Sequence, residues 1–217
     1  MTDGFTLYGS PHSQYTYKVA LMLRLSGAPF SFRYVSFQKG MHRTPAFRAL
    51  SRWGQVPVLR HGERNLVQSA AILEYLAETL GKFAGVDPET RQYIREFLYW
   101  DADRFGPAVY GCYGVRLNAL KLLPFPCDPA VAAHHRDGAE GALAALDTAL
   151  ATGDFLAAPR PTIADIACYG EVAFAELSQL DLSRWPYLVA WSRRIAALPG
   201  FAAPFDLLPM ADTEIMP

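Results

Sequence analysis

Cysteine is scarce in this 217-residue chain. Its three cysteines, Cys112, Cys127 and Cys168, are too few and too scattered for a disulfide framework, and no pair has C-x-x-C or metal-ligand spacing. We therefore expect buried or incidental thiols and no metal site.

An excess of charge is also missing, because 20 basic and 21 acidic residues leave a net charge of -1. Such a balance gives no excess of positive charge for binding nucleic acid. No run approaches the roughly 18 apolar residues of a membrane-spanning helix, and the first residues lack the basic start and long apolar core of a secretory signal. We expect a cytoplasmic protein that binds neither nucleic acid nor membrane.

What is present is ample apolar content, 51% of the residues, arranged in two different patterns. Up to about Gly85 the pattern is mixed α and β. Strands are expected at 5–9 and 30–37 and on both sides of a turn at 61–63, and helices at 14–27 and 69–81. With a short irregular or helical piece before the turn, this is the element order of a thioredoxin-like α/β domain.

After this point the pattern becomes helical. Asp87-Pro88-Glu89 is typical of a helix start, and long amphipathic patterns continue to about residue 200 without a convincing strand. Thr162 stands three residues before Asp165, which predicts a structural capping box. We expect a thioredoxin-like domain over residues 1–84, a linker over 85–91 and an all-α domain over 92–217.

Hydroxyl side chains gather where the first strand meets the first helix, at Ser10, Ser13 and Thr16. Serine is a preferred helix N-cap, since its oxygen accepts a backbone N–H that the first turn leaves unpaired. The same helix end carries about half a positive charge, so a hydroxyl donor there is well placed to stabilise an anion.

Five motifs, in order and at matching separations, resemble the cytosolic glutathione transferases of the serine type, theta-like or bacterial. They are SQYTYKV at 13–19, KGMH at 39–42, GQVPVL at 54–59, QSAAILEYL at 68–76 and TIADIA at 162–167. The resemblance covers essentially the whole chain. It implies a homodimeric detoxification enzyme that takes glutathione as co-substrate, needs no metal and conjugates a small hydrophobic electrophile.

In serine-type members a serine at this helix start serves the glutathione sulfur, which gives that catalytic role to Ser13. Three alternatives stay open, of which one is a purely structural turn without a catalytic group. Tyr8 lies five residues earlier, at the place of the catalytic tyrosine in tyrosine-type members, and Ser10 precedes Pro11 and caps or shapes the loop. Redox relatives carry cysteine at this turn, whereas a hydroxyl cannot form a mixed disulfide.

The resemblance also implies glutathione contacts in the loop before the third strand. A cis bond before Pro57 would let the backbone of Val56 pair with the cysteinyl part of glutathione, as an added strand does. Only about 5–6% of X-Pro bonds are cis, so the residues alone favour a trans proline that opens a strand. Gln55 is expected as a second contact.

Two further segments complete the expected glutathione site. Gln68 and Ser69 would bind the γ-glutamyl part at a helix start, although Ser69 is equally acceptable as an N-cap. Lys39 and His42 belong to a local positive cluster that is either a solvated surface or the site of the glycyl carboxylate.

The expected second substrate would lie against the helix that carries Tyr110 and Tyr113, although aromatic stripes are more often core. The residues do not separate conjugation from other glutathione-dependent reactions, namely those of a peroxidase, a disulfide-bond reductase, a dehalogenase or an isomerase. A non-catalytic interaction module on the same scaffold is the alternative of a different class.

Overall fold

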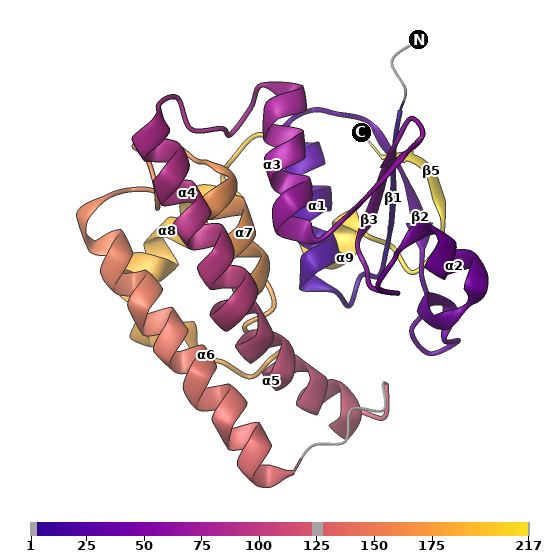
Figure 1. The fold of residues 1–217 in the computed structure, drawn as a ribbon. Helices are drawn as coiled ribbons and strands as arrows, with labels where there is room; N and C mark the ends of the chain where they lie inside the picture. Colours follow the sequence, from indigo (N-terminus) through magenta and orange to yellow (C-terminus); the bar gives the residue numbers. More distant parts are fainter. Residues whose placement is uncertain (1–3, 123–127, 217) are drawn as a thin grey trace. The chain divides into compact units, whose positions relative to one another are not determined.

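The computed structural model describes residues 4–122 and 128–216 (Figure 1). The chain divides into two compact units. One contains residues up to Lys82 together with those from Leu198 onward, and the other is Phe83–Ala197. The expected assignment of the whole stretch 92–217 to the helical domain is therefore wrong at its end, because residues 198–216 pack with the N-terminal unit.

The N-terminal unit is built on a five-stranded mixed sheet in the order β4-β3-β1-β2-β5. Its strands are β1 (Phe5–Gly9), β2 (Phe30–Tyr34), β3 (Val58–His61), β4 (Arg64–Val67) and β5 (Thr213–Met216). Strands β1 and β2 are parallel and the other neighbours are antiparallel. The first four strands and the turn between β3 and β4 follow the prediction, whereas β5 lies in the region assigned to the helical domain.

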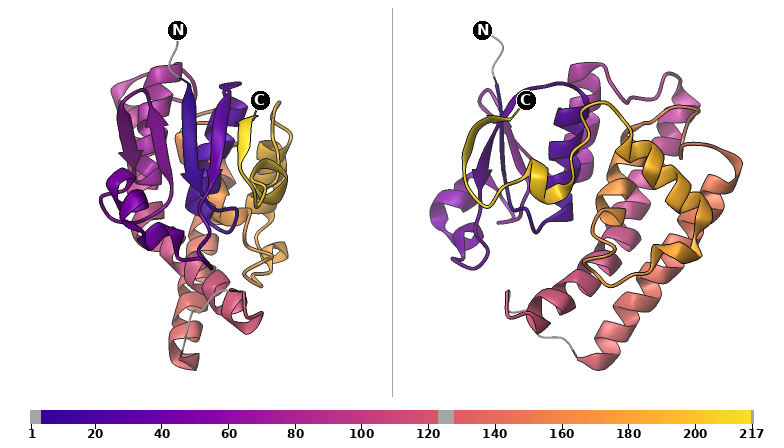
Figure 2. Two further views of the ribbon diagram at one scale, coloured as in Figure 1. Left: turned by 90° about the vertical axis from the view of Figure 1, so that its right-hand side faces the viewer. Right: turned by 180° about the vertical axis from the view of Figure 1, so that it is seen from behind.

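Helices cover both faces of this sheet. α1 (Gln14–Leu25) and α3 (Ser69–Leu80) lie on one face, and α2 (Pro45–Leu50) lies on the other, after the 3-10 turn η1 (Met41–Arg43) (Figures 1 and 2). Period-two alternation directs Leu7 of β1 to the face opposite Tyr8. Tyr8 packs on an apolar cluster, the α2-side cluster, formed by Val35, Phe47, Val58 and Val67.

The ends of α1 follow from its sequence. Ser13 is the N-cap, with its side-chain oxygen accepting the Thr16 N–H at 3.2 Å. At the other end Gly27 has a φ of 66°, and the N–H of Ala28 reaches back to the carbonyl of Leu23 at 3.0 Å. Glycine suits this left-handed position, so the helix stops where the sequence predicts.

The second unit contains helices and no strand in the part that the structure describes. Its helices are α4 (Pro88–Trp100), α5 (Gly106–Ala119), α6 (Pro129–Ala149), α7 (Ile163–Val172) and α8 (Pro186–Ala196), with the 3-10 turns η3 (Leu150–Thr152) and η4 (Leu182–Arg184). Asp87 caps α4 by accepting the Thr90 N–H at 2.8 Å. The expected linker over 85–91 is thus too long, because the helix already begins at Pro88. Cys112 and Cys168 are buried, as expected, and neither forms a disulfide within the described residues, whereas Cys127 lies outside them.

A π-helical turn, η2 (Asp101–Phe105), joins α4 to α5. The N–H of Gly106 bonds the carbonyl of Asp101, five residues back. Pro107 gives a physical reason, because it has no N–H for the carbonyl four residues earlier and its ring crowds that carbonyl. The helix therefore widens for one turn and continues.

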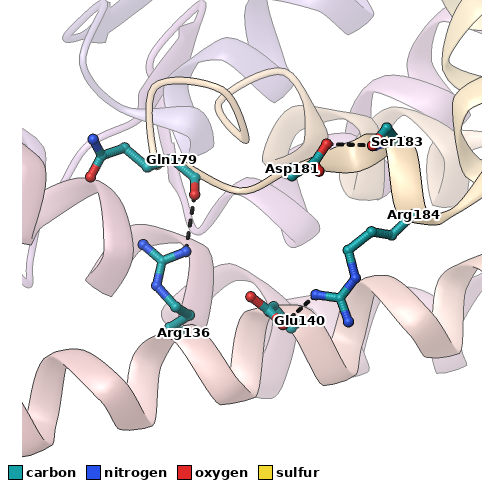
Figure 3. Close-up of polar contacts among 6 residues, drawn as sticks. All are labelled: Arg136, Glu140, Gln179, Asp181, Ser183 and Arg184. Carbon is teal, nitrogen blue, oxygen red and sulfur yellow. Dashed lines mark hydrogen bonds and ion pairs between the residues drawn. The ribbon is translucent and has the colours of Figure 1, made fainter.

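Side chains of α6 fix the segment between α7 and α8, as Figure 3 shows. Arg136 donates to the carbonyl of Gln179 at 3.0 Å, and Arg184 forms an ion pair with Glu140 at 2.7 Å. Asp181 accepts the Ser183 N–H and so starts the short turn η4.

Within the described ranges, no helix has the length and apolar character needed to cross a bilayer.

Candidate functional site

The turn between β1 and α1 is organised by Ser10. The carbonyl of Ser10 accepts the Ser13 N–H at 3.0 Å, and its side-chain oxygen accepts the His12 N–H at 3.3 Å. Ser10 is also almost fully buried, with 1% of its surface exposed. These bonds give Ser10 the loop-shaping role that the sequence left open.

Ser13 presents its hydroxyl at the positive end of α1. A hydroxyl has one donor and two acceptor positions. Capping of the Thr16 N–H uses one acceptor position, and in the described part of the chain the O–H of Ser13 donates to no other group. The capping role and the donor role are thus compatible in the same atom, and the helix dipole favours an anionic acceptor there.

Tyr8 lies in different surroundings. Its ring packs on the α2-side cluster, and the Arg60 guanidinium lies 5.8 Å from the ring centroid. This apolar and cation–π contact accounts for an aromatic residue near the end of β1 without a chemical role.

The loop before β3 carries the predicted cis peptide bond, Val56–Pro57. Ser51 holds this loop, since its hydroxyl accepts the Gln55 N–H at 3.1 Å and donates to the Gln55 carbonyl at 2.8 Å. Neither backbone group of Val56 forms a hydrogen bond with any described residue. The loop is therefore fixed while the N–H and C=O of Val56 stay available for an extended ligand. Sequence reasoning gave no role to Ser51, because a lone serine is too common a signal.

At the start of α3 the structure corrects one expectation. Ser69 is the first helical residue rather than the N-cap, and Gln68 occupies the cap position with a φ of 70° and no capping hydrogen bond from its side chain. Its amide instead donates to the Gln55 side-chain oxygen at 3.3 Å. The fold thus brings together two predicted residues thirteen positions apart. Backbone strain of this kind costs about 1–3 kcal/mol and concentrates at functional sites.

The segment with Lys39 and His42 lies beside the same loop, since a Cβ on Gly54 would be 3.3 Å from the His42 carbonyl. The His42 ring accepts a hydrogen bond from the Arg43 side chain at 3.2 Å, and burial followed by the Arg43 charge lowers the pKa of His42. The positive charge expected there therefore belongs to Lys39 and Arg43. No hydrogen bond or ion pair among the described residues joins Lys39 or His42 to Gln55 or Gln68.

The two predicted pocket tyrosines belong to α5 of the helical unit. Tyr113 is 3% exposed and meets the Phe174 ring edge-on at 5.4 Å between centroids. Burial raises the pKa of Tyr113 to about 12, and burial also raises the pKa of Tyr110, which is half-buried. Core packing accounts for Tyr113, and the lining of a substrate pocket by either residue stays a prediction.

Taken together, these features define a thioredoxin-fold protein with a hydroxyl, and no cysteine, at the start of the first helix. Residues 7–82 match the glutathione S-transferase N-terminal domain, and residues 129–194 match the glutathione S-transferase C-terminal domain. The chain belongs to the glutathione S-transferase family.

Individual relatives match nearly the whole chain. A maleylacetoacetate isomerase of Rhizobium meliloti is 32% identical, over 93% of this chain and 95% of its own. Glutathione S-transferase theta-2 of Homo sapiens is 28% identical, over 91% and 82%. The crystal structure of a glutathione S-transferase from Pseudomonas fluorescens superposes with a TM-score of 0.84 at 27% identity, over 93% and 99% of the two chains.

Proposed function

We propose that this chain is a glutathione transferase that binds glutathione and stabilises its thiolate for attack on a hydrophobic electrophile. The observation that carries the proposal is the buried Ser13 hydroxyl, which caps α1 and whose O–H donates to no other group among the described residues.

The Ser13 hydroxyl at the start of α1 can supply the free energy that is needed to stabilise the thiolate. A free thiol has a pKa of about 8.5 and is mostly protonated at neutral pH. Lowering that pKa by about two units takes roughly 2.7 kcal/mol of preference for the anion. A hydrogen bond to a charged group supplies about 1.5–3 kcal/mol, and the helix end adds a fraction of a kcal/mol. No general base is needed.

The remaining contacts place the rest of glutathione. Val56 pairs its free backbone groups with the cysteinyl residue, as in strand addition. The γ-glutamyl carboxylate lies at the start of α3 against the Ser69 hydroxyl, where Gln68 supplies no side-chain cap. The amides of Gln55 and Gln68 lie beside it, and the Gln68 amide hydrogen-bonds the ligand near its ammonium group. Lys39 and neutral His42 meet the glycyl carboxylate.

Two substitutions of Ser13 separate its two roles. Ser13→Ala removes both the cap and the donor, whereas Ser13→Asp keeps an acceptor for the cap but replaces the donor by a negative charge. We expect both variants to raise the pKa of the bound thiol, measured by thiolate absorbance against pH. We also expect the conjugation rate to fall about 10- to 100-fold, the equivalent of about 1.4–2.7 kcal/mol, while affinity for glutathione changes much less.

Ser10→Ala and Tyr8→Phe are the matched controls. Ser10→Ala removes the acceptor of the His12 N–H within the turn, so we expect it to raise the pKa of the bound thiol less than Ser13→Ala does. Tyr8 packs on the α2-side cluster, so Tyr8→Phe should leave that pKa unchanged. Full activity in Ser13→Ala, or a loss confined to one of the controls, would move the role away from Ser13.

An isomerase acting through the same thiolate is the second candidate, favoured by the maleylacetoacetate isomerase relative. Peroxidase, disulfide-bond reductase and dehalogenase reactions use the same thiolate, and a non-catalytic module would bind glutathione without shifting its pKa. Rates with halogenated aromatics, hydroperoxides, mixed disulfides and a cis-configured unsaturated diacid distinguish these functions.

The proposal includes a cytoplasmic, homodimeric detoxification enzyme, which is what the family resemblance implies. In some members of the family, an acid from the partner subunit reaches the ammonium group of the bound glutathione, and Asp101 and Asp103 are the candidates for that role here. Asp103 is exposed and paired with Arg104 at 2.8 Å, whereas Asp101 is buried, so we propose Asp103. Light scattering at micromolar concentration measures the assembly, and a monomer would remove this role of Asp103.

A further inference from the structure

The C-terminal segment, residues 198–216, returns to the N-terminal unit and packs on it (Figure 2). Its short helix α9 (Pro204–Leu207) packs against α1, and Leu207 and Leu208 are almost fully buried. β5 then adds to the sheet beside β2, where Asp212 also accepts the Tyr34 N–H at 2.6 Å. The segment is therefore an integral part of the unit that carries Ser13.

Two of its contacts lie on either side of Ser13 in the sequence. Phe205 meets the ring of His12, the residue immediately before Ser13, edge-on at 5.5 Å between centroids. On the other side, the Tyr17 hydroxyl donates to the carbonyl of Ala202 at 2.9 Å. The N–H of Tyr17 is in turn the group that bonds the Ser13 carbonyl, at 3.0 Å.

Each contact has a physical basis, although Phe205 itself is 43% exposed. Tyr17 is fully buried, so its hydroxyl needs a partner, and the Ala202 carbonyl supplies one 185 residues away in sequence. Burial lowers the pKa of His12, so its ring stays uncharged at neutral pH and suits an aromatic edge contact. The His12 N–H also bonds the Ser10 hydroxyl, which links the Phe205 contact to the turn itself.

We propose that the C-terminal segment is a positioning element of the thiol site, in which Phe205 and Ala202 hold His12 and Tyr17 and thereby fix the direction of the Ser13 hydroxyl. The inference rests on the proposed role of Ser13 as the donor to glutathione sulfur. It adds that the pKa of the bound thiol depends on residues at the opposite end of the chain. A hydroxyl that is free to turn gives a longer and less aligned hydrogen bond, which stabilises the thiolate less.

The test compares three variants of the full chain. Phe205→Ala removes the ring from His12, Phe205→Tyr keeps an aromatic edge, and Met210→Ala is a matched control at an exposed position of the same segment. Each variant is titrated with glutathione for the pKa of the bound thiol and with S-methylglutathione, which has no thiol, for the affinity of the rest of the site.

We expect Phe205→Ala to raise the pKa of the bound thiol by about half a unit, which is roughly a threefold change in the ionisation constant of the thiol. The dissociation constant for S-methylglutathione should stay within about twofold, because the other contacts remain. Phe205→Tyr and Met210→Ala should keep the wild-type pKa. Tyr17→Phe, which removes only one hydroxyl, should raise the pKa in the same direction as Phe205→Ala.

The experiment distinguishes failure of the positioning role from failure of the proposed function. If Ser13→Ala raises the pKa of the bound thiol and both Phe205→Ala and Tyr17→Phe leave it unchanged, the positioning role is wrong and the proposed function stands. Equal weakening of glutathione and S-methylglutathione with no change of thiol pKa would show a merely structural segment. If the wild-type protein itself binds glutathione without a pKa shift, the proposed function fails first.

Discussion

Asp165 is the buried acid on which the helical unit should depend most. Its two carboxylate oxygens accept four hydrogen bonds: from Trp191 Nε1 at 2.9 Å, from the Leu156 N–H at 2.9 Å, and from the N–H and hydroxyl of Thr162 at 2.8 and 3.1 Å. This is the predicted capping box of α7, extended to a second helix and a loop. Three separate segments thus converge on one side chain with no exposed surface.

The variant Asp165→Asn keeps the shape and replaces one acceptor oxygen by an NH2 group. The asparagine amide keeps most hydrogen bonds if its oxygen faces the Leu156 N–H and Trp191 Nε1. Its NH2 group then faces the Thr162 N–H, so two donors meet and no hydrogen bond forms between them. The lost bond to a charged group costs about 1.5–3 kcal/mol, and the unsatisfied buried donor adds about 1–3 kcal/mol. Burial raises the pKa of Asp165 more than its hydrogen bonds lower it, so the neutral amide recovers some desolvation cost.

We therefore expect Asp165→Asn to lower the free energy of unfolding by about 2–4 kcal/mol and the melting temperature by about 5–15 °C. Urea unfolding followed by circular dichroism measures the first quantity. One of the four tryptophan indole N–H resonances should also shift, because Trp191 loses its charged partner. The control is Asp87→Asn at the solvent-facing cap of α4, where asparagine caps equally well and stability should hardly change. If Asp165→Asn and Asp87→Asn lowered the free energy of unfolding equally, the convergence of three segments on Asp165 would not explain its importance for stability.

Two further predictions concern glycine packing and acid stability. Gly111→Ala should destabilise the protein by about 1–3 kcal/mol, because the added Cβ would overlap the His135 ring. Gly141→Ala places its Cβ in open space on α6 and should stabilise the protein by about 1 kcal/mol. Urea unfolding of both variants checks that the two effects have opposite signs. Burial lowers the pKa of His12 and His42, so the unfolded chain takes up protons first and stability should fall as the pH drops below about 6.5. The double variant His12→Asn, His42→Gln should flatten that dependence between pH 7.5 and 5.5, and an unchanged slope would contradict it.

The sequence was sufficient for the parts of the fold that local rules control. Gly27 ends α1 because a left-handed residue is needed there, and Asp87 with Pro88 starts α4 because a capping acid and a fixed φ favour a first turn. The cis bond before Pro57 was expected only from the family resemblance, since the residues alone favour trans.

Long-range packing decided what the sequence did not show. β5 has no strong strand pattern, and it forms because β2 presents an edge that the chain reaches after α8. Likewise Ser69 has the side chain of an N-cap, but Gln68 occupies the cap position and its side chain bonds Gln55. Contacts such as Tyr17 with Ala202 join opposite ends of the chain, and no single-sequence pattern reports them.

The two helix starts of the candidate site differ in a way that matches two of the anionic groups of glutathione, the thiolate and the γ-glutamyl carboxylate. At α1 the Ser13 oxygen already caps the first turn, so Ser13 can offer a ligand only its single O–H. One directed donor suits a sulfur atom. At α3 the side chain in the cap position turns to Gln55 and caps nothing, so the first-turn N–H groups have no cap from it. A carboxylate, with two oxygens and a full charge, complements several N–H donors better than one hydroxyl does. The fold therefore offers one directed donor at the first helix start and several N–H groups at the second, and this difference supports the proposed orientation of the tripeptide along Val56.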